Sequence, residues 1–364
     1  MSKSSLNVVL GTINFGAADQ ELTRVHDVKS VEAILDVFQQ HGHTEVDTAR
    51  TYGGGTSEEF LGQVDWRGRG LKLETKLFPV PVRELCLAGE RIAFTEAPNP
   101  ICSDIIHHTP EGLRTFLDRS LKALNADSVE IWYLHGPDRS VPYEVTLKAV
   151  NDLYKEGKFK RFGISNYMSW EVAEMVQICR ANGWIQPTVY QGVYNAIHRS
   201  VEPELFPCLR KYGMSFYSFS PLANGFLLGR YHSVNDQVEA GSRFDPNKLS
   251  GKQASPDELL VPLSMLIHMF QRIWKEPFFK AVETIKAVTD KHNLTLAEVA
   301  LRWISHHSLL KRELGDSVII GVSKVEHIKQ NLLDLEKGPL PDDVVNALDE
   351  AWSQVLPFAS KYYF

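Results

Sequence analysis

The chain has 364 residues, a length that a single α/β barrel domain commonly reaches. Hydrophobic residues make up 43% and charged residues 23%, which excludes disorder of the whole chain. The net charge of −6, without a dense Lys/Arg stripe, argues against a nucleic-acid partner. No apolar run approaches the roughly 18 residues that a membrane span requires. The four cysteines are scattered and no signal-peptide pattern is found, so we expect free thiols and a cytoplasmic protein.

Eight short apolar or β-branched runs alternate with longer amphipathic segments. We predict strands at residues 8–10, 44–46, 71–75, 129–134, 159–162, 188–190, 215–217 and 318–320. Apolar residues at helical spacing predict helices at residues 30–40, 111–124, 170–181, 202–212 and 296–306. Before the last helix, Thr295 and Glu298 have the spacing of a capping box. Eight strand–helix units favour a closed (β/α)8 TIM barrel, with residues 1–364 as one domain.

Three segments interrupt this alternation. Residues 78–108 are proline-rich and too long for a simple connection, and residues 231–280 are longer still. In the second segment, Ser255 precedes a further predicted helix with Pro256 at its first position. The segment after Leu340 ends in aromatic residues, which are Trp352, Phe358, Tyr362, Tyr363 and Phe364. Because long connections after barrel strands gather at the active-site face, we expect long loops and this tail near the active-site mouth.

Polar residues suited to proton transfer follow three successive predicted strands. Asp47 ends the first, Tyr52 comes five residues later, and Lys76 and His135 end the next two. Each of them alone would more often be structural, since an Asp commonly caps a turn and a Lys commonly lies on the surface. Because barrel strand ends converge on one mouth, we expect all four side chains at one site.

This combination of side chains suits the reduction of a carbonyl group. A phenol has an ordinary pKa of about 10, so Tyr52 alone would be a slow proton donor at neutral pH. A nearby ammonium stabilises the phenolate, and Lys76 would supply it while Asp47 keeps Lys76 charged and in position. His135 would hydrogen-bond the substrate oxygen and orient the carbonyl. General acid catalysis of this kind contributes roughly 10²–10⁴-fold.

Further motifs extend the pattern over roughly residues 7–355. They are Asp47-Thr48-Ala49 with Tyr52, Ser57-Glu58, Leu61-Gly62, Lys76, residues 120–124, 133–138 and 163–167, Gln191, Tyr194-Asn195, and residues 220–223, 321–323 and 330–332. With these motifs the chain resembles the aldo-keto reductase superfamily, closest to its aflatoxin-aldehyde reductase branch and the fungal relatives of that branch. The resemblance implies a (β/α)8 barrel and a catalytic set of Asp47, Tyr52, Lys76 and His135.

The resemblance also implies NADPH bound without a Rossmann domain. In agreement, no GxGxxG opens a helix after a strand, and we interpret Gly53-Gly54-Gly55 as a flexible active-site loop. Ser165, Asn166 and Gln191 match positions that hold the nicotinamide carboxamide, and Phe219 matches the aromatic residue that stacks on the ring. The other residues carried over for the cofactor are Gly11, Thr12, Asp47, Ser220, Pro221, Leu222, Asn224, Leu227, Gly229, Arg230, Arg243, Gly321, Ser323, Lys324, His327, Gln330 and Asn331.

The segment expected at the 2′-phosphate departs from the family pattern. Many relatives place a Lys where this chain has Gly321 and an Arg where it has His327. The loss of a guanidinium relaxes selection against NADH. Since the aflatoxin-aldehyde reductase branch departs in the same way, NADPH remains the prediction.

The substrate is predicted to contact Tyr52, His135 and three further aromatic residues, which are Phe15, Tyr194 and Phe226. Such a pocket favours an aromatic or bulky carbonyl compound. The predicted function is therefore NADPH-dependent reduction of an aldehyde or ketone by a monomer or homodimer, and the resemblance makes a role in secondary metabolism plausible.

Alternative functions remain open at this stage. The same groups serve alcohol oxidation in reverse, and potassium-channel β subunits show that this fold also forms cofactor-binding regulatory subunits. A metal-dependent barrel hydrolase using Asp47 and His135 is a further class. No metal is expected, because the adjacent histidines in the sequence are poorly placed to ligate one ion and no third ligand stands at zinc-site spacing.

Overall fold

The computed structural model describes residues 4–80, 83–87, 90–94, 104–239, 242, 244–245 and 273–364. Two sequence predictions, the helix after Ser255 and the phosphate contact of Arg243, lie outside the described residues. Among the described helices, none is both long enough and apolar enough to cross a membrane.

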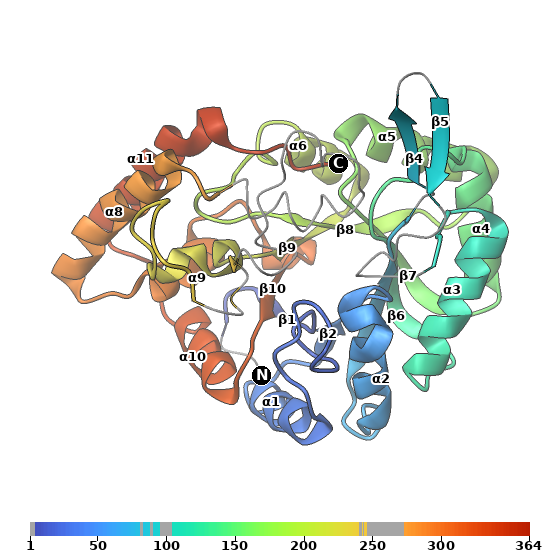
Figure 1. Cartoon of the computed structure of the whole chain (residues 1–364), viewed down its shortest axis with the longest axis horizontal. Helices are drawn as coiled ribbons and strands as arrows, with labels where there is room; N and C mark the ends of the chain where they lie inside the picture. Colours follow the sequence, from blue (N-terminus) through green and yellow to red (C-terminus); the bar gives the residue numbers. More distant parts are fainter. Residues whose placement is uncertain are drawn as a thin grey trace.

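Eight parallel strands close into a barrel in the order β1-β10-β9-β8-β7-β6-β3-β2 (Figure 1). Their bounds are β1 Asn7–Gly11, β2 Glu45–Asp47, β3 Lys72–Leu77, β6 Val129–Leu134, β7 Phe159–Ser165, β8 Pro187–Val193, β9 Ser215–Phe219 and β10 Ser317–Gly321. The predicted (β/α)8 fold is therefore confirmed. The predicted strands overlap all eight, and the largest differences are three residues at the C-terminal ends of β7 and β8.

Helices between the strands cover the outside of the barrel (Figure 1). They are α1 Val28–Gln40, α2 Thr56–Gln63, α3 Pro110–Ala123, α4 Tyr143–Lys155, α5 Ser169–Asn182, α6 Leu205–Tyr212, α8 Glu276–Thr289, α9 Leu296–His306, α10 Val325–Leu335 and α11 Asp342–Val355. The five predicted helices are confirmed, although α6 begins three residues later than expected. An antiparallel pair, β4 Arg83–Leu87 and β5 Glu90–Phe94, lies in the segment that was predicted only as a long connection.

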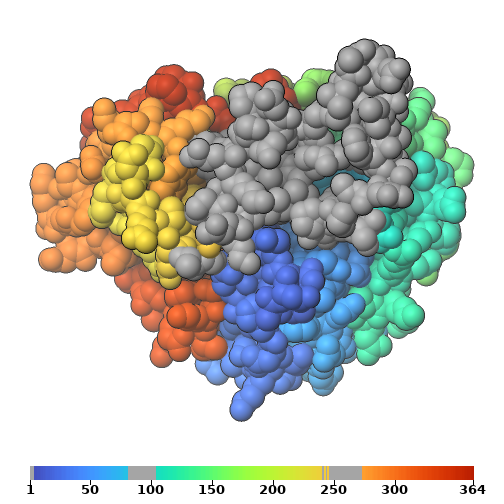
Figure 2. Space-filling model, viewed as in Figure 1, coloured from blue at the N-terminus to red at the C-terminus, as the bar shows by residue number. Residues whose placement is uncertain are grey.

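The barrel closes between the two ends of the chain. Strand β1 pairs with β10 from Asn7 opposite Ser317 to Gly11 opposite Gly321. Figure 2 shows the resulting surface, on which the blue N-terminal part lies beside the orange and red C-terminal part. The start of α9 is capped as predicted, because the Glu298 backbone N–H donates to Thr295 Oγ1 at 3.1 Å. The Glu298 carboxylate instead pairs with Arg302 and Lys337, so only half of the expected capping box forms.

Two layers of apolar side chains hold the barrel together. The larger layer fills the space between strands and helices, and the smaller one fills the barrel interior with Val9, Ile131, Tyr133, Val189, Tyr217 and Ile319. Gly163 makes room for the Tyr133 ring, since a Cβ at this glycine would lie 2.2 Å from Tyr133 Cδ1. The interior is therefore a packed core, and chemistry is confined to the strand ends.

Candidate active site

The four residues predicted as catalytic lie together at one end of the barrel. Asp47 ends β2, Lys76 is the penultimate residue of β3, and His135 directly follows β6. Tyr52 opens a short 3-10 turn, Tyr52–Gly55, in the connection after β2. The rings of Tyr52 and His135 lie 5.9 Å apart at an interplanar angle of 75°. Lys76 Nζ lies 4.9 Å from the Tyr52 ring centroid. The convergence predicted from the strand ends is thus present.

Lys76 is fully buried, and its ammonium has three short contacts. It donates to Asp47 Oδ1 and Oδ2, each at 2.6 Å, and to the Thr48 carbonyl oxygen at 2.7 Å. Burial alone would lower the pKa of Lys76, but the Asp47 carboxylate and the Tyr52 hydroxyl outweigh burial and raise it above the ordinary value. Lys76 is therefore a permanent positive charge beside the Tyr52 ring.

His135 faces Tyr52 as a neutral imidazole. Burial, followed by the positive charge of Lys76, lowers the pKa of His135 well below its ordinary value. The His135 backbone is fixed by bonds to Leu77 and Asn166. Among the described residues no hydrogen-bond partner meets its buried Nδ1 atom. A neutral imidazole can donate from one nitrogen and accept at the other, so it is suited to hydrogen-bond a ligand.

The glycine run after Tyr52 forms a turn with left-handed backbone angles. Gly53, Gly54 and Gly55 have φ values of +54°, +61° and +101°, in the left-handed region that favours glycine. A Cβ at Gly55 would lie 1.4 Å from Arg50 Nη2. Arg50 is occupied by an ion pair of 2.5 Å with the buried Glu58. The turn and this ion pair together fix the start of the segment that carries Tyr52.

Residues predicted to hold the nicotinamide lie on the neighbouring strand ends. Ser165 ends β7, Phe219 ends β9, and Gln191 lies within β8. Gln191 Nε2 donates to Asp47 Oδ1 at 2.8 Å, which joins this group to the catalytic pair. Asn166 has a positive φ of 67°, and its Nδ2 donates to Ser165 Oγ at 2.9 Å. The amide groups of this cluster are the hydrogen-bonding type that a carboxamide requires.

The first strand and the loop after β9 supply backbone close to this cluster. Gly11 pairs with both Asp47 and Gly321, while Thr12 is fully buried and donates from Oγ1 to the Asp47 carbonyl at 3.0 Å. After β9, positive φ angles occur at Ser220, Ala223, Asn224 and Gly229. Pro221 is buried and Leu222 is half-buried. The Leu227 side chain is buried in the core, so only its backbone is available to a ligand.

Residues predicted at the 2′-phosphate gather around the start of α10. Ser323 Oγ lies 3.1 Å from His327 Nδ1, and Lys324 directly precedes the helix. Burial, followed by the charges of Lys324 and Arg230, lowers the pKa of His327. Arg230 forms an exposed pair with Glu239 at 3.0 Å. The remaining residues are the exposed Gly321, Gln330, which donates to Asp334, and the buried Asn331.

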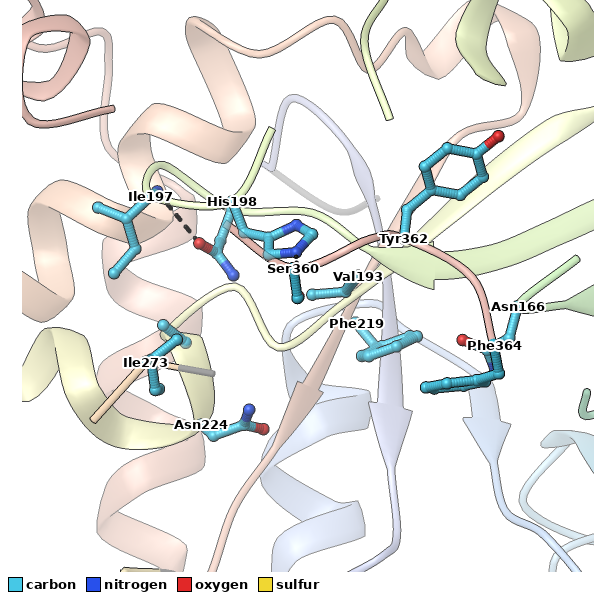
Figure 3. Close-up of a pocket in the computed structure, with 12 residues that line it drawn as sticks. Asn166, Val193, Ile197, His198, Phe219, Asn224, Ile273, Ser360, Tyr362 and Phe364 are labelled. Atoms are coloured by element: carbon cyan, nitrogen blue, oxygen red, sulfur yellow. Dashed lines mark hydrogen bonds between the residues drawn. The ribbon is translucent and has the colours of Figure 1, made fainter. Parts of the chain in front are cut away.

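The C-terminal tail closes a pocket next to Phe219 (Figure 3). The pocket is lined by Asn166, Val193, Asn195, Ile197, His198, Phe219, Ala223, Asn224, Ile273, Ser360, Tyr362 and Phe364. The Phe364 N–H donates to the Asn166 carbonyl at 3.3 Å, and Arg139 Nη2 donates to the Phe364 carbonyl at 2.7 Å. His198 Nε2 lies 2.9 Å from Ser360 Oγ. The expected position of the tail near the active-site mouth is confirmed.

The three aromatic residues predicted as additional pocket walls are buried elsewhere. Tyr194 packs against Phe206, Phe216 and Trp303, and its hydroxyl donates to Glu202 at 2.6 Å. Tyr194 therefore packs between β8 and the outer helices, and it does not line the pocket next to Phe219.

Phe226 and Phe15 do not line the described pocket either. Phe226 packs against the rings of Phe244, Trp274 and Phe279. Phe15 is fully buried in the turn after β1, where it forms a β-bridge with Val25. The aromatic residues that line the described pocket are Phe219, Tyr362 and Phe364. Proximity to strand ends could have indicated Asn195 and His198, whereas only the fold brings the distant tail residues to this place.

Comparison with known proteins accounts for this arrangement. Residues 7–353 match the family described as the aldo/keto reductase family. The chain belongs to the aldo-keto reductase family. This aldo-keto reductase is 46% identical over 331 residues to an aldo-keto reductase of Pseudocercospora fijiensis, which covers 91% of this chain and 100% of the relative. It is 41% identical to the aldo-keto reductase pigE of Monascus ruber, over 99% of this chain and 98% of that protein.

A mammalian relative bears a name that refers to a substrate. The human protein aflatoxin B1 aldehyde reductase member 2 is 38% identical to this aldo-keto reductase. The match covers 98% of this chain and 89% of the human protein. The resemblance found from the sequence motifs is thereby confirmed at the level of the family and of its aflatoxin-aldehyde reductase branch.

Proposed function

We propose that this aldo-keto reductase uses NADPH to reduce an aldehyde or ketone, of aromatic or bulky type, to the alcohol. The observation that carries the proposal is the buried Asp47–Lys76 ion pair, with Lys76 Nζ 4.9 Å and the His135 ring 5.9 Å from the Tyr52 ring. A phenol, a fixed positive charge and a neutral hydrogen-bonding ring are the groups that protonation of a carbonyl oxygen needs.

The residues present fit a nicotinamide cofactor. Phe219 offers a ring face at the pocket, and the amides of Asn166 and Gln191 match the donors and acceptors of a carboxamide. Lys324 and Arg230 bring positive charge to the residues expected at the 2′-phosphate. NADPH supplies the hydride when bound, and the residues above would hold it.

The side chains of Tyr52, Lys76 and His135 would each have a separate role in the proton transfer. Tyr52 donates its hydroxyl proton to the carbonyl oxygen and is left as a phenolate. Lys76 stabilises that phenolate through its charge, because its N–H groups are already engaged by Asp47 and Thr48. His135 hydrogen-bonds the substrate oxygen as a neutral ring. Alcohol oxidation would use the same groups in reverse.

The test of this proposal is a panel of aromatic and aliphatic aldehydes and ketones, assayed through the loss of NADPH absorbance. Turnover of at least one class of carbonyl compound is expected. Binding of NADPH without turnover of any carbonyl compound or alcohol would favour the cofactor-binding regulatory subunit instead.

We expect His327→Arg to raise the preference for NADPH over NADH. A guanidinium next to Ser323 and Lys324 would add charge-assisted hydrogen bonds to a 2′-phosphate, which corresponds to a change of about 10–100-fold in the ratio of the two kcat/KM values. The control is His292→Arg, since His292 lies in the 3-10 turn Asp290–His292 after α8 and pairs with Asp343. An unchanged ratio in His327→Arg would show that this position does not read the phosphate.

We also propose that the tail shapes the carbonyl site, and we expect Arg139→Ala to loosen it. Arg139 links the Phe364 carbonyl to Glu171, so its loss removes a charge-assisted bond at the tail. The KM for a bulky carbonyl substrate should rise about 5–10-fold while the Kd for NADPH stays unchanged. Arg114→Ala, which breaks an exposed pair with Glu156, is the matched control. Equal effects of the two variants on KM would contradict a role for the tail.

A further inference from the structure

A second carboxyl group lies inside the barrel next to the catalytic ion pair, and the proposed mechanism does not use it. Glu74 lies on β3 two residues before Lys76, so both side chains point to the barrel interior. Its Cα pairs directly with that of Asp47 on β2. Glu74 is fully buried. A buried carboxyl group at this position affects the charge that surrounds Lys76.

Among the described residues, Glu74 has one neutral hydrogen-bond donor and no cation in an ion pair with it. Its Oε2 accepts from the Tyr133 hydroxyl at 2.9 Å, and no hydrogen-bond partner meets Oε1 among the described residues. The nearby Lys76 ammonium is already saturated by Asp47 and Thr48. A buried carboxylate without a cation partner costs far more free energy than the protonated form, so the proton stays on the acid.

Charged and titratable groups face Glu74 from the surrounding strands. They are Glu45 and Asp47 on β2, Lys76 on β3, Tyr133 on β6, Arg161 on β7 and Tyr217 on β9. Arg161 is directed to the Tyr217 hydroxyl at 3.5 Å, and that hydroxyl donates to Glu45 at 3.1 Å. Burial, followed by the negative charges of Asp47 and Glu45, raises the pKa of Glu74 well above its ordinary value.

Tyr133 connects Glu74 to the ammonium. Its ring centroid lies 5.9 Å from Lys76 Nζ, and its hydroxyl is the group that meets Glu74. The ring occupies the space that Gly163 leaves open. Lys76 therefore has the Tyr52 ring and the Tyr133 ring near it, and the second ring is held in place by Glu74.

We propose that Glu74 is a positioning residue for the proton transfer by Tyr52, and that it is a neutral carboxylic acid at neutral pH. This role rests on the proposed reductase function. With Glu74 neutral, Asp47 is the carboxylate that balances Lys76, and the Lys76 charge remains available to the Tyr52 phenolate. When Glu74 loses its proton at alkaline pH, its negative charge opposes formation of that phenolate. Tyr52 then keeps its proton to higher pH, and reduction continues there.

The first test is infrared difference spectroscopy of the full chain at pH 7, which needs no substrate. Glu74→Gln should lose a carbonyl stretch of a protonated carboxylic acid that the wild type shows. The matched control is Glu45→Gln, whose carboxylate is partly exposed and lies 3.7 Å from Lys72; this variant should keep the band. Loss of only carboxylate absorption in Glu74→Gln would show that Glu74 is ionised and would overturn the proposal.

The second test is the pH dependence of carbonyl reduction, which a merely structural role would not change. Near neutral pH, Glu74→Gln should match the wild type. Its alkaline fall in rate should begin about one pH unit lower, which is about a tenfold lower rate at the same alkaline pH. Coinciding pH profiles would overturn the positioning role even if the acid band is lost. Absence of turnover by the wild type would refute the reductase function and leave the infrared result intact.

Tyr133→Phe covers the case in which Glu74→Gln does not fold. This variant removes the hydroxyl that meets Glu74 and keeps the ring near Lys76. The acid band should then shift in frequency, because the carboxylic acid has lost its hydrogen bond. An unchanged spectrum would contradict the pairing of Glu74 with Tyr133.

Discussion

Replacement of Tyr52 by Phe is expected to lower kcat for carbonyl reduction by about 10²–10⁴-fold, the usual contribution of a general acid. The Phe ring can keep the edge contact with His135 and the position near Lys76, so the site should retain its shape. The Phe side chain lacks the hydroxyl proton that Tyr52 would donate to the carbonyl oxygen. The Kd for NADPH, measured by fluorescence titration, should stay close to that of the wild type, while NADPH absorbance follows the loss of turnover with an aromatic aldehyde.

Tyr154→Phe provides the matched control for this experiment. Tyr154 is an exposed residue of α4, outside the catalytic cluster. Its replacement by Phe removes the same hydroxyl group. Its kcat should equal that of the wild type. A Tyr52→Phe variant that reduced the aldehyde at the original rate would show that Tyr52 is not the acid. A parallel loss of NADPH affinity would show that the hydroxyl serves binding.

The barrel and the catalytic cluster could be predicted because local sequence determines both. The barrel strands are short segments rich in apolar or β-branched residues and are separated by amphipathic segments, which is typical of parallel strands covered by helices. In a parallel barrel, all the strand ends point to one mouth. Asp47, Lys76 and His135 therefore converge wherever the exact strand boundaries fall.

Side-chain direction explains why Tyr194 packs against the outer helices and does not line the described pocket. Successive residues of a strand point to opposite faces, and Gln191 contacts Asp47 inside the barrel. Val193 shares that face and lines the pocket, so Tyr194 has to point outward to the helices. The same rule places Glu74 inside with Lys76, although its bond to Tyr133 is visible only in the structure.

Other parts of the site depend on contacts between distant segments. Phe226 lies in a 3-10 turn, η2 Ala223–Leu228, where no simple alternation assigns its side chain to a face. Phe364 meets Asn166 from nearly two hundred residues away. Nothing in the local sequence of the tail specifies that contact, since it depends on how α11 directs the chain back over the barrel. Aromatic composition alone therefore could not distinguish pocket walls from packing residues.

The second large effect is expected for the buried ion pair. In Lys76→Met, the Asp47 carboxylate keeps the bond from Gln191 but loses its buried cation. In Asp47→Asn, the Lys76 ammonium keeps its carbonyl partner, Thr48, and loses its counter-charge. Removal of one member of a buried pair costs about 3–5 kcal/mol of unfolding free energy, which urea titration measures. Both variants should also lose most carbonyl reduction.

The double variant Asp47→Asn/Lys76→Met separates stability from catalysis. It buries no unpaired charge, so its unfolding free energy should exceed the value that the sum of the two single losses predicts by about 1–3 kcal/mol. Its reductase activity should stay as low as that of Lys76→Met, because no positive charge is left to stabilise the Tyr52 phenolate. Additive losses of stability would show that the two groups are not coupled in solution. Recovered activity in the double variant would show that Tyr52 does not need the ammonium, and the electrostatic part of the mechanism would then be wrong.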